Sequence, residues 1–94
     1  MSFKMVGPNR VESDEGYGFE VLSMTLMRYF EGSRSMRIQC EVLSKPWTVA
    51  LHADDIRGWS APDQQRPVTA ADRERILLRL QGMFGFQGAT LEVT

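Results

Sequence analysis

Seven residues in the middle of the chain alternate between apolar and polar side chains, and this pattern constrains the fold more than any other. The apolar positions are Met36, Ile38, Cys40 and Val42, and the polar positions are Arg37, Gln39 and Glu41. Successive side chains of a β-strand point to opposite faces, so the alternation predicts a strand with one buried and one exposed face. The buried face requires a second layer of structure to cover it.

A second strand is predicted from Phe19 to Phe30, because this segment is rich in strand-favouring residues. The break at residues 31–34 is short enough to join the two strands in a β-hairpin. Pairing Phe30 with Met36 places one apolar set on the buried face: Leu22, Met24, Leu26 and Phe30, with Arg28 as the exception. The same register pairs Leu26 with Cys40 and Met24 with Val42.

A slip of one residue would bury Met27 and Tyr29 and turn the other set outward. The first register buries more apolar side chains, and it is therefore the predicted one.

An amphipathic helix is predicted after residue 69. Thr69 is suited to the N-cap, and Asp72 stands three residues later, where a capping box places its acid. The apolar positions fall within one helical stripe: Ile76, Leu77, Leu80, Met83 and Phe84. A stripe of this width is suited to cover one face of a sheet. Leu78 points away from it.

The remaining segments complete one small domain. A strand is predicted over residues 48–52 after a break at residues 44–46, and a last strand over residues 89–93. Asp54 is expected to cap a single helical turn that Gly58 ends in a left-handed conformation. Residues 1–18 are expected to form an N-terminal arm or loop with one short strand at residues 3–6.

The predicted fold is therefore a single α+β domain over residues 19–94. Its elements run strand, strand, strand, helix, strand. They form a mainly antiparallel sheet of four to five strands with one amphipathic helix packed on one face.

Composition excludes several classes of function. The chain has 94 residues, a formal net charge of −1, one cysteine and one histidine. Near neutrality argues against nucleic acid and against a membrane surface as partner. No apolar run approaches the length of a transmembrane helix, and no export signal is visible at the N-terminus. The single cysteine allows no internal disulfide, and a cytoplasmic protein is expected.

Cys40 and His52 form the only nucleophilic dyad that the composition permits. Cys40 lies on the predicted buried face, where a cysteine acts as a small apolar residue and its thiol pKa rises. His52 is expected to be a surface or hydrogen-bonded histidine. We therefore predict no catalytic residues.

No cofactor or metal site is predicted either. Asp54 and Asp55 are able to bind a divalent cation together with Glu41 or Glu92, but a turn cap explains Asp54 without an ion. The glycines at residues 16–18 precede a strand, whereas a dinucleotide site needs them between a strand and a helix.

Two tryptophans lie outside the regular alternation, each beside a proline-containing loop. Trp47 follows Pro46, and Trp59 follows the turn predicted at Asp54. Buried aromatic residues anchor small cores, whereas tryptophans at a surface dominate protein interfaces. Packing beneath a loop is the preferred interpretation of each residue, and a contact with a partner is the alternative.

Several short motifs occur in a characteristic order. They are Glu31-Gly-Ser-Arg-Ser-Met-Arg-Ile38, Asp55-Ile-Arg-Gly-Trp59 with Pro62 after it, Arg75-Ile76, and Phe86-Gln-Gly88 before Leu91-Glu-Val93. Together they resemble the Immunity protein 74 family of bacterial polymorphic toxin systems, over about residues 21–93. The resemblance implies a cytoplasmic, non-catalytic protein that binds a cognate toxin and blocks it. The matching positions are Arg37, Arg57 and Trp59, and with Trp47 they are our candidate partner-binding residues.

Two other hypotheses remain. A homodimeric structural or binding module would use free sheet edges and an exposed Leu78. A small enzyme would use Cys40 with His52.

Overall fold

The chain folds into two β-sheets and one long helix, as seen in a computed structural model that describes residues 2–44 and 47–94. The five-stranded antiparallel sheet has the order β1 (Phe3–Gly7), β2 (Arg10–Ser13), β3 (Tyr17–Ser23), β4 (Leu26–Glu31), β5 (Arg34–Gln39). The three-stranded sheet has the order β6 (Glu41–Ser44), β7 (Trp47–Leu51), β8 (Thr90–Val93). Between β7 and β8 lie the 3₁₀ helix η1 (Ala53–Asp55) and the helix α1 (Ala70–Gln87).

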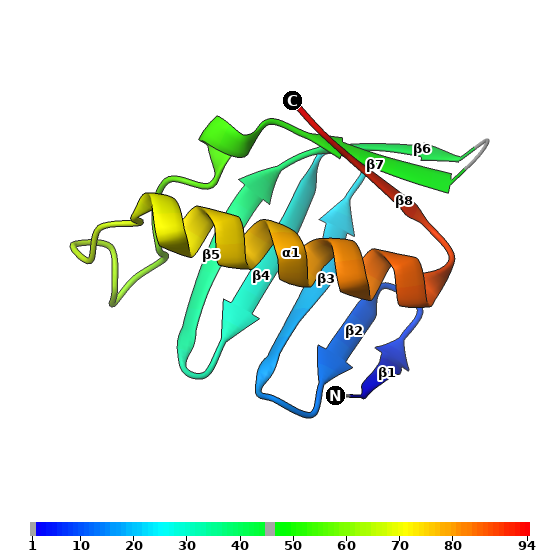
Figure 1. Ribbon diagram of the computed structural model, residues 1–94, viewed down its shortest axis with the longest axis horizontal. Coiled ribbons are helices and arrows are strands. Elements are labelled where there is room, and N and C mark those ends of the chain that lie inside the picture. The colour runs from blue at the N-terminus through cyan, green and yellow to red at the C-terminus, as the bar shows by residue number, and fades with distance from the viewer. Residues whose placement is uncertain (1, 45–46) are drawn as a thin grey trace.

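The layers share one core. Figure 1 shows α1 running across one face of the five-stranded sheet, while the three-stranded sheet passes over the end of the large sheet where β3 turns into β4. The α+β class is confirmed, as is a helix on one face of an antiparallel sheet with one strand after the helix. The prediction of a single sheet was wrong, because the chain leaves the large sheet after β5 and starts a second one. Within that second sheet, β7 and β8 are parallel.

The N-terminal residues are part of the large sheet. The short strand expected at residues 3–6 lies within β1, but β2 and the start of β3 replace the expected arm or loop. Val11 and Tyr17 are buried in the core. The acidic, glycine-containing stretch between them is a tight turn in which Gly16 adopts φ +88°, a conformation that favours glycine. We therefore correct the arm to two strands and a turn.

The predicted hairpin register was wrong by one residue. Tyr29, not Phe30, pairs with Met36, and Met27 pairs with Ile38. Met27 and Tyr29 are fully buried, whereas Met24 is 61% exposed. Leu26 accordingly pairs with Gln39 and not with Cys40.

The physical reason is a turn that the pattern did not reveal. The predicted strand over residues 19–30 is two strands, β3 and β4, joined at Met24 and Thr25. Phe19 of β3 pairs with Tyr29 of β4, so both aromatic side chains face α1. The opposite face carries Arg28 and Phe30. Arg28 was the one polar residue in the stripe predicted to be buried, and it lies on the outer face of the sheet.

Cys40 lies between the two sheets. It follows the last residue of β5 and precedes β6, and its backbone N–H donates to the Thr25 carbonyl at 3.0 Å. Val42, the next apolar residue of the alternation, belongs to β6 and packs against the core. The thiol is therefore partly buried rather than enclosed. Ser44 ends β6, and the rest of the predicted break, Lys45 and Pro46, lies outside the described residues.

The helix is confirmed with its caps. Thr69 Oγ1 accepts from the Asp72 backbone N–H at 3.0 Å, and Asp72 Oδ2 accepts from the Thr69 backbone N–H at 3.1 Å. Gly88 closes the C-terminus with φ +84°. The buried residues of α1 are Ile76, Leu80, Met83 and Phe84. Leu78 is 63% exposed, as expected.

The turn before the helix differs from the prediction. His52, not Asp54, occupies the N-cap of η1, and no side chain caps this turn. Among the described residues, positive φ angles occur at three other glycines and not at Gly58. Backbone bonds therefore hold the turn, with the Ile56 N–H donating to the Ala53 carbonyl at 3.1 Å.

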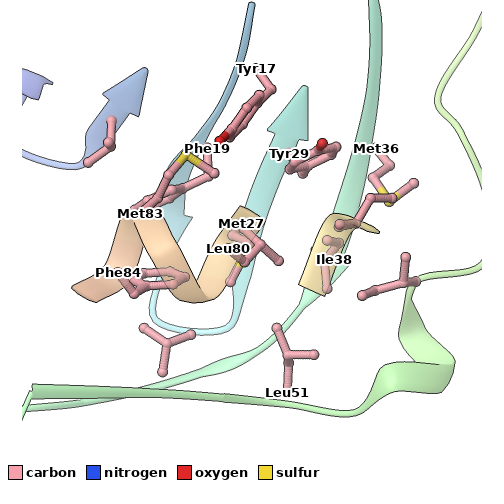
Figure 2. Close-up of a cluster of buried hydrophobic side chains, with 14 of the residues drawn as sticks. Tyr17, Phe19, Met27, Tyr29, Met36, Ile38, Leu51, Leu80, Met83 and Phe84 are labelled. Atoms are coloured by element: carbon pink, nitrogen blue, oxygen red, sulfur yellow. The ribbon is translucent and has the colours of Figure 1, made fainter. Parts of the chain in front are cut away.

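The core lies between α1 and the two sheets. Figure 2 shows residues of α1 facing side chains of β3, β4 and β5, with Leu51 of β7 on another side of the cluster. Phe84 and Phe19 are the closest aromatic pair of this core, with ring centroids 4.3 Å apart. The helix and the two sheets thus bury each other's apolar faces, which would be unfavourable if they were exposed to water.

A charged cluster joins α1 to the β4–β5 hairpin. Glu31, whose side chain is 12% exposed, accepts from Arg75 Nη2 at 2.7 Å and from Arg79 Nη1 at 3.1 Å. Arg34 lies 3.9 Å from the same carboxylate. Arg79 also donates to the Tyr29 hydroxyl. Arg75 also donates to Asp72 Oδ1 at 2.8 Å, so Glu31 lies among three guanidinium groups at the edge of the core and shares one of them with Asp72.

Glu31→Gln is expected to lower the free energy of unfolding by about 2 kcal/mol, because it leaves the partly buried Arg79 without its counter-charge and Arg75 with Asp72 alone. Urea denaturation at unchanged m-value measures the effect. Glu74→Gln, on the exposed side of α1, is the matched control and should change stability by less than about 0.5 kcal/mol. Equal effects of the two substitutions would show that the cluster contributes no specific stability.

Gly18 is required by the aromatic ring opposite it. Phe30 pairs with Gly18 across β3 and β4, and a Cβ at Gly18 would lie 2.5 Å from both Phe30 Cζ and the Val11 carbonyl oxygen. Since the backbone oxygen cannot move aside, Gly18→Ala should cost about 2 kcal/mol of stability. The control is Gly82→Ala in α1, where the nearest atom is 3.6 Å away, and this change should stabilise by about 0.5–1 kcal/mol. Thermal unfolding should show a lower melting temperature for Gly18→Ala and a higher one for Gly82→Ala than for the wild type.

Candidate functional site

Three of the four candidate partner-binding residues line one depression on the outer side of β5. This arginine depression has a volume of about 380 Å³ and is lined by Leu26, Arg37, Gln39, Asp55, Arg57, Gly58 and Trp59. Strand alternation positions one part of it, because Met36 and Ile38 face the core and thereby turn Arg37 and Gln39 outward. The segment that follows η1 supplies the other part.

Backbone and side-chain hydrogen bonds hold that segment against the sheet. The Ser60 N–H donates to the Ser35 carbonyl of β5 at 2.7 Å. From the other side, Arg73 Nε of α1 donates to the Ile56 carbonyl at 3.3 Å. These bonds place residues 55–59 beside β5, although the two segments are far apart in the sequence.

Trp59 is a wall of this depression. It is 3% exposed, and the Arg34 guanidinium lies 4.7 Å from its ring centroid. Its indole Nε1 is buried and has no hydrogen-bond partner among the described residues. Most of the Trp59 side chain is therefore packed beneath the loop, as the preferred interpretation expected, and only its edge is available to a partner.

Arg37 and Arg57 are the accessible residues of the arginine depression. Both are exposed, and neither forms an ion pair or hydrogen bond through its side chain with any residue in the described ranges. Arg37 lies directly opposite Arg28 in the β4–β5 pairing. Like charges placed opposite each other across strands destabilise a sheet, so this arrangement favours an anion nearby.

Trp47 lines a second hollow on the other side of the β3–β4 turn. This apolar depression has a volume of about 270 Å³ and is lined by Asn9, Val21, Leu22, Ser23, Met24, Val42 and Trp47. Leu22 is 43% exposed and Met24 more so. The turn separates the two depressions, because Met24 lines one of them and Leu26 lines the other. Three of the four candidate residues thus share the arginine depression, and Trp47 lines the separate apolar depression.

A third depression contains the two residues of the alternative enzyme hypothesis. Its volume is about 330 Å³, and Cys40, His52 and Asp55 are among its lining residues. The ring Nδ1 of His52 shares a hydrogen bond with the Thr94 hydroxyl. No hydrogen bond joins Cys40 to His52 within residues 2–44 and 47–94.

The chemistry of Cys40 differs from that of an activated nucleophile. Burial raises the pKa of the Cys40 thiol, so the protonated form dominates at neutral pH. Nucleophilic cysteines need the opposite shift, which a nearby imidazolium or a helix N-terminus supplies. The depression therefore brings the dyad residues together without activating the thiol.

The divalent cation site considered for Asp54 and Asp55 does not form among the described residues. In the part of the chain that the structure describes, no three His, Cys, Asp or Glu side chains converge on a common point suited to a metal ion. Asp54 is exposed on η1, and Asp55 lies at the border of two depressions.

Sequence reasoning missed the exposed apolar pair Leu22 and Met24 and the outward position of Arg28. The signal was present, since an arginine in the middle of a predicted buried stripe contradicts that assignment. The same observation would have identified Phe30 as an outer-face residue, where the guanidinium groups of Arg10 and Arg28 lie 4.8 and 4.9 Å from its ring centroid.

Comparison with protein-family models, with curated proteins and with solved structures finds no match to the chain. Over the described residues, no helix combines the length and the apolar character needed to cross a bilayer.

Native Cys40 is expected to react with iodoacetamide at pH 8 at least about tenfold more slowly than in the urea-unfolded chain, because burial and the raised thiol pKa both limit thiolate attack. Mass spectrometry of timed samples gives both rates, with free glutathione in urea as the reference for solvent effects. His52→Ala should leave the native rate unchanged. A fast native reaction that slows in His52→Ala would instead establish a thiolate–imidazole pair.

Proposed function

We propose that this protein is a non-catalytic immunity protein of the cytoplasm that binds and neutralises a cognate bacterial toxin domain. The observation that carries the proposal is the gathering of three of the four candidate residues around the arginine depression. Arg37, Arg57 and Trp59 also belong to the motifs that resemble the Immunity protein 74 family. Trp47, on the small sheet, lines the apolar depression on the other side of the β3–β4 turn.

The composition of the two depressions is typical of a protein interface. Interfaces place apolar and aromatic residues at their centre, favour arginine and methionine, and surround them with polar groups. Here Trp47, Leu22 and Met24 supply the apolar part, and Arg37 and Arg57 supply the arginine part. Exposed apolar side chains that gather beside a hollow mark an interaction site more often than scattered ones do.

The size of the surface also agrees with this role. A stable interface covers about 800 Å² on each partner. The accessible surface of the whole molecule is 5574 Å², so such a contact takes about one seventh of it. Two neighbouring depressions and the turn between them are a suitable centre for a patch of this extent.

The homodimer hypothesis involves a different surface. Leu78 lies in a shallow hollow on the solvent side of α1, together with Leu77 and Gln81. This hollow is built from α1 alone, whereas the apolar depression combines both sheets and the arginine depression combines the large sheet with residues 55–59. Substitutions at Trp47 and Leu78 therefore distinguish the two hypotheses.

The test is binding to the toxin encoded beside this protein. The purified proteins should form a 1:1 complex, and the complex should lack the toxin's activity. Trp47→Ala should weaken the complex at least about tenfold, since a tryptophan at an interface centre contributes more than 1.4 kcal/mol. Leu78→Ala is the control and should leave the affinity unchanged.

Three results would overturn the proposal: no complex with the neighbouring product, a neighbouring product without toxicity, or full toxin activity within the complex. A homodimer that Leu78→Glu dissociates and that binds no toxin would establish the structural module instead. Light scattering of the wild type and Leu78→Glu measures the assembly state.

A further inference from the structure

We infer that the arginine depression is a carboxylate-binding site, and that it takes an aspartate or glutamate side chain from an acidic segment of the partner. This inference rests on the proposed function and specifies the chemistry of the contact. It predicts that the toxin presents an acidic surface to this protein, which is the reverse of an acidic inhibitor entering a basic active site.

The first argument is the state of the two exposed arginines. Three arginines elsewhere form ion pairs: Arg10 binds Glu12, and Arg75 and Arg79 bind Glu31. Arg66 is exposed and unpaired among the described side chains, but it stands outside the depression. Arg37 and Arg57 also have no partner among the described side chains, and both line the same depression. A guanidinium group presents its N–H donors in a planar fork that matches a carboxylate. Two such groups at one hollow are suited to bind the two oxygens of one acid.

The second argument is the charge balance around the hollow. Asp55 is the acidic residue of its lining, against two arginines. Arg28, outside this lining, stands opposite Arg37 in the β4–β5 pairing, and its guanidinium lies 4.9 Å from the Phe30 ring centroid. Glu20 pairs with Arg28 on its other side. The facing pair of Arg28 and Arg37 costs stability in the free protein. A bound carboxylate relieves this repulsion, so part of its binding free energy comes from the sheet itself.

The third argument is the apolar wall. Leu26 and Trp59 line the depression together with the arginines. Apolar walls lower the local dielectric constant, which strengthens a charge-assisted hydrogen bond relative to one in open water. A site on flat solvated surface lacks this gain, which is why most exposed ion pairs contribute little.

The outer face is less suited to nucleic acid. Proteins that bind single strands combine a continuous basic path with aromatic rings on which bases stack. Here Glu12, Glu20 and Asp55 interrupt the basic residues. The ring of Phe30 has guanidinium groups 4.8 and 4.9 Å from its centroid and lies against Gly18 on the sheet. A single carboxylate fits this surface better than a phosphate backbone does.

The experiment is an NMR titration of the ¹⁵N-labelled protein with a hexaglutamate peptide at low salt. The two tryptophans give two indole N–H signals that report on the two depressions separately. The Trp59 indole signal and the Gly58 amide signal should shift saturably, whereas the Trp47 indole signal should stay in place. Hexalysine should shift neither, and raising the salt concentration should weaken the hexaglutamate effect.

Arg37→Gln and Arg57→Gln should each weaken hexaglutamate binding at least about fivefold, since each removes one guanidinium fork. The matched control is Arg66→Gln, which removes an equally exposed arginine from the loop before α1 and should leave the titration unchanged. The spectra of all three variants also show whether each remains folded.

Several outcomes would overturn the inference. They are no saturable shift at Trp59, an equal loss in Arg66→Gln, or tighter binding of the oligonucleotide dT10 or of inorganic phosphate at the same residues. If Trp47→Ala disrupts the toxin complex while Arg37→Gln and Arg57→Gln leave it intact, the inference fails and the proposed function stands. If hexaglutamate binds at the depression but the neighbouring toxin does not bind the protein, the proposed function fails and the carboxylate site stands.

Discussion

The register between β4 and β5 determines both the core and the surface of this molecule. It turns Met27 and Tyr29 toward α1, and the same alternation turns Arg28 and Arg37 toward solvent. A slip of one residue would bury guanidinium groups beneath a helix and expose two large apolar side chains. The arginine depression therefore follows from the packing of the opposite face and needs no separate device to orient its strand residues.

Local signals made α1 predictable, whereas nothing local determined the register. The capping box at Thr69 and Asp72 and the apolar stripe are properties of adjacent residues, and the structure has them all. The residues from Phe19 to Phe30 offered two apolar faces of similar quality, and the turn at Met24 contains no glycine or proline to mark it. The pairing of Phe19 with Tyr29 decided between them, and this is a contact between strands.

The candidate residues could be named from the sequence, but the sequence did not predict which of them lie close together in the fold. Arg57 and Trp59 reach Arg37 because Ser60 bonds to Ser35 of β5, a contact over 25 positions of the chain that no periodicity encodes. The division into two sheets was hidden for a similar reason. The alternation continues through Cys40 without a break, although the chain passes there from one sheet to the other.

The two tryptophans have different surroundings, and they would contribute differently to the proposed interface. Trp59 is buried between Arg34 and the depression, so it shapes the hollow while contributing little accessible area. Trp47 and the two exposed arginines are the groups that the proposed partner would contact. A wall fixed by the core reduces the ordering cost of association, because the long side chains of Arg37 and Arg57 are then the main groups that must lose freedom. In the proposed interface, a substitution of Trp59 would disturb folding and binding together, whereas substitutions of the exposed Arg37 and Arg57 would affect binding alone.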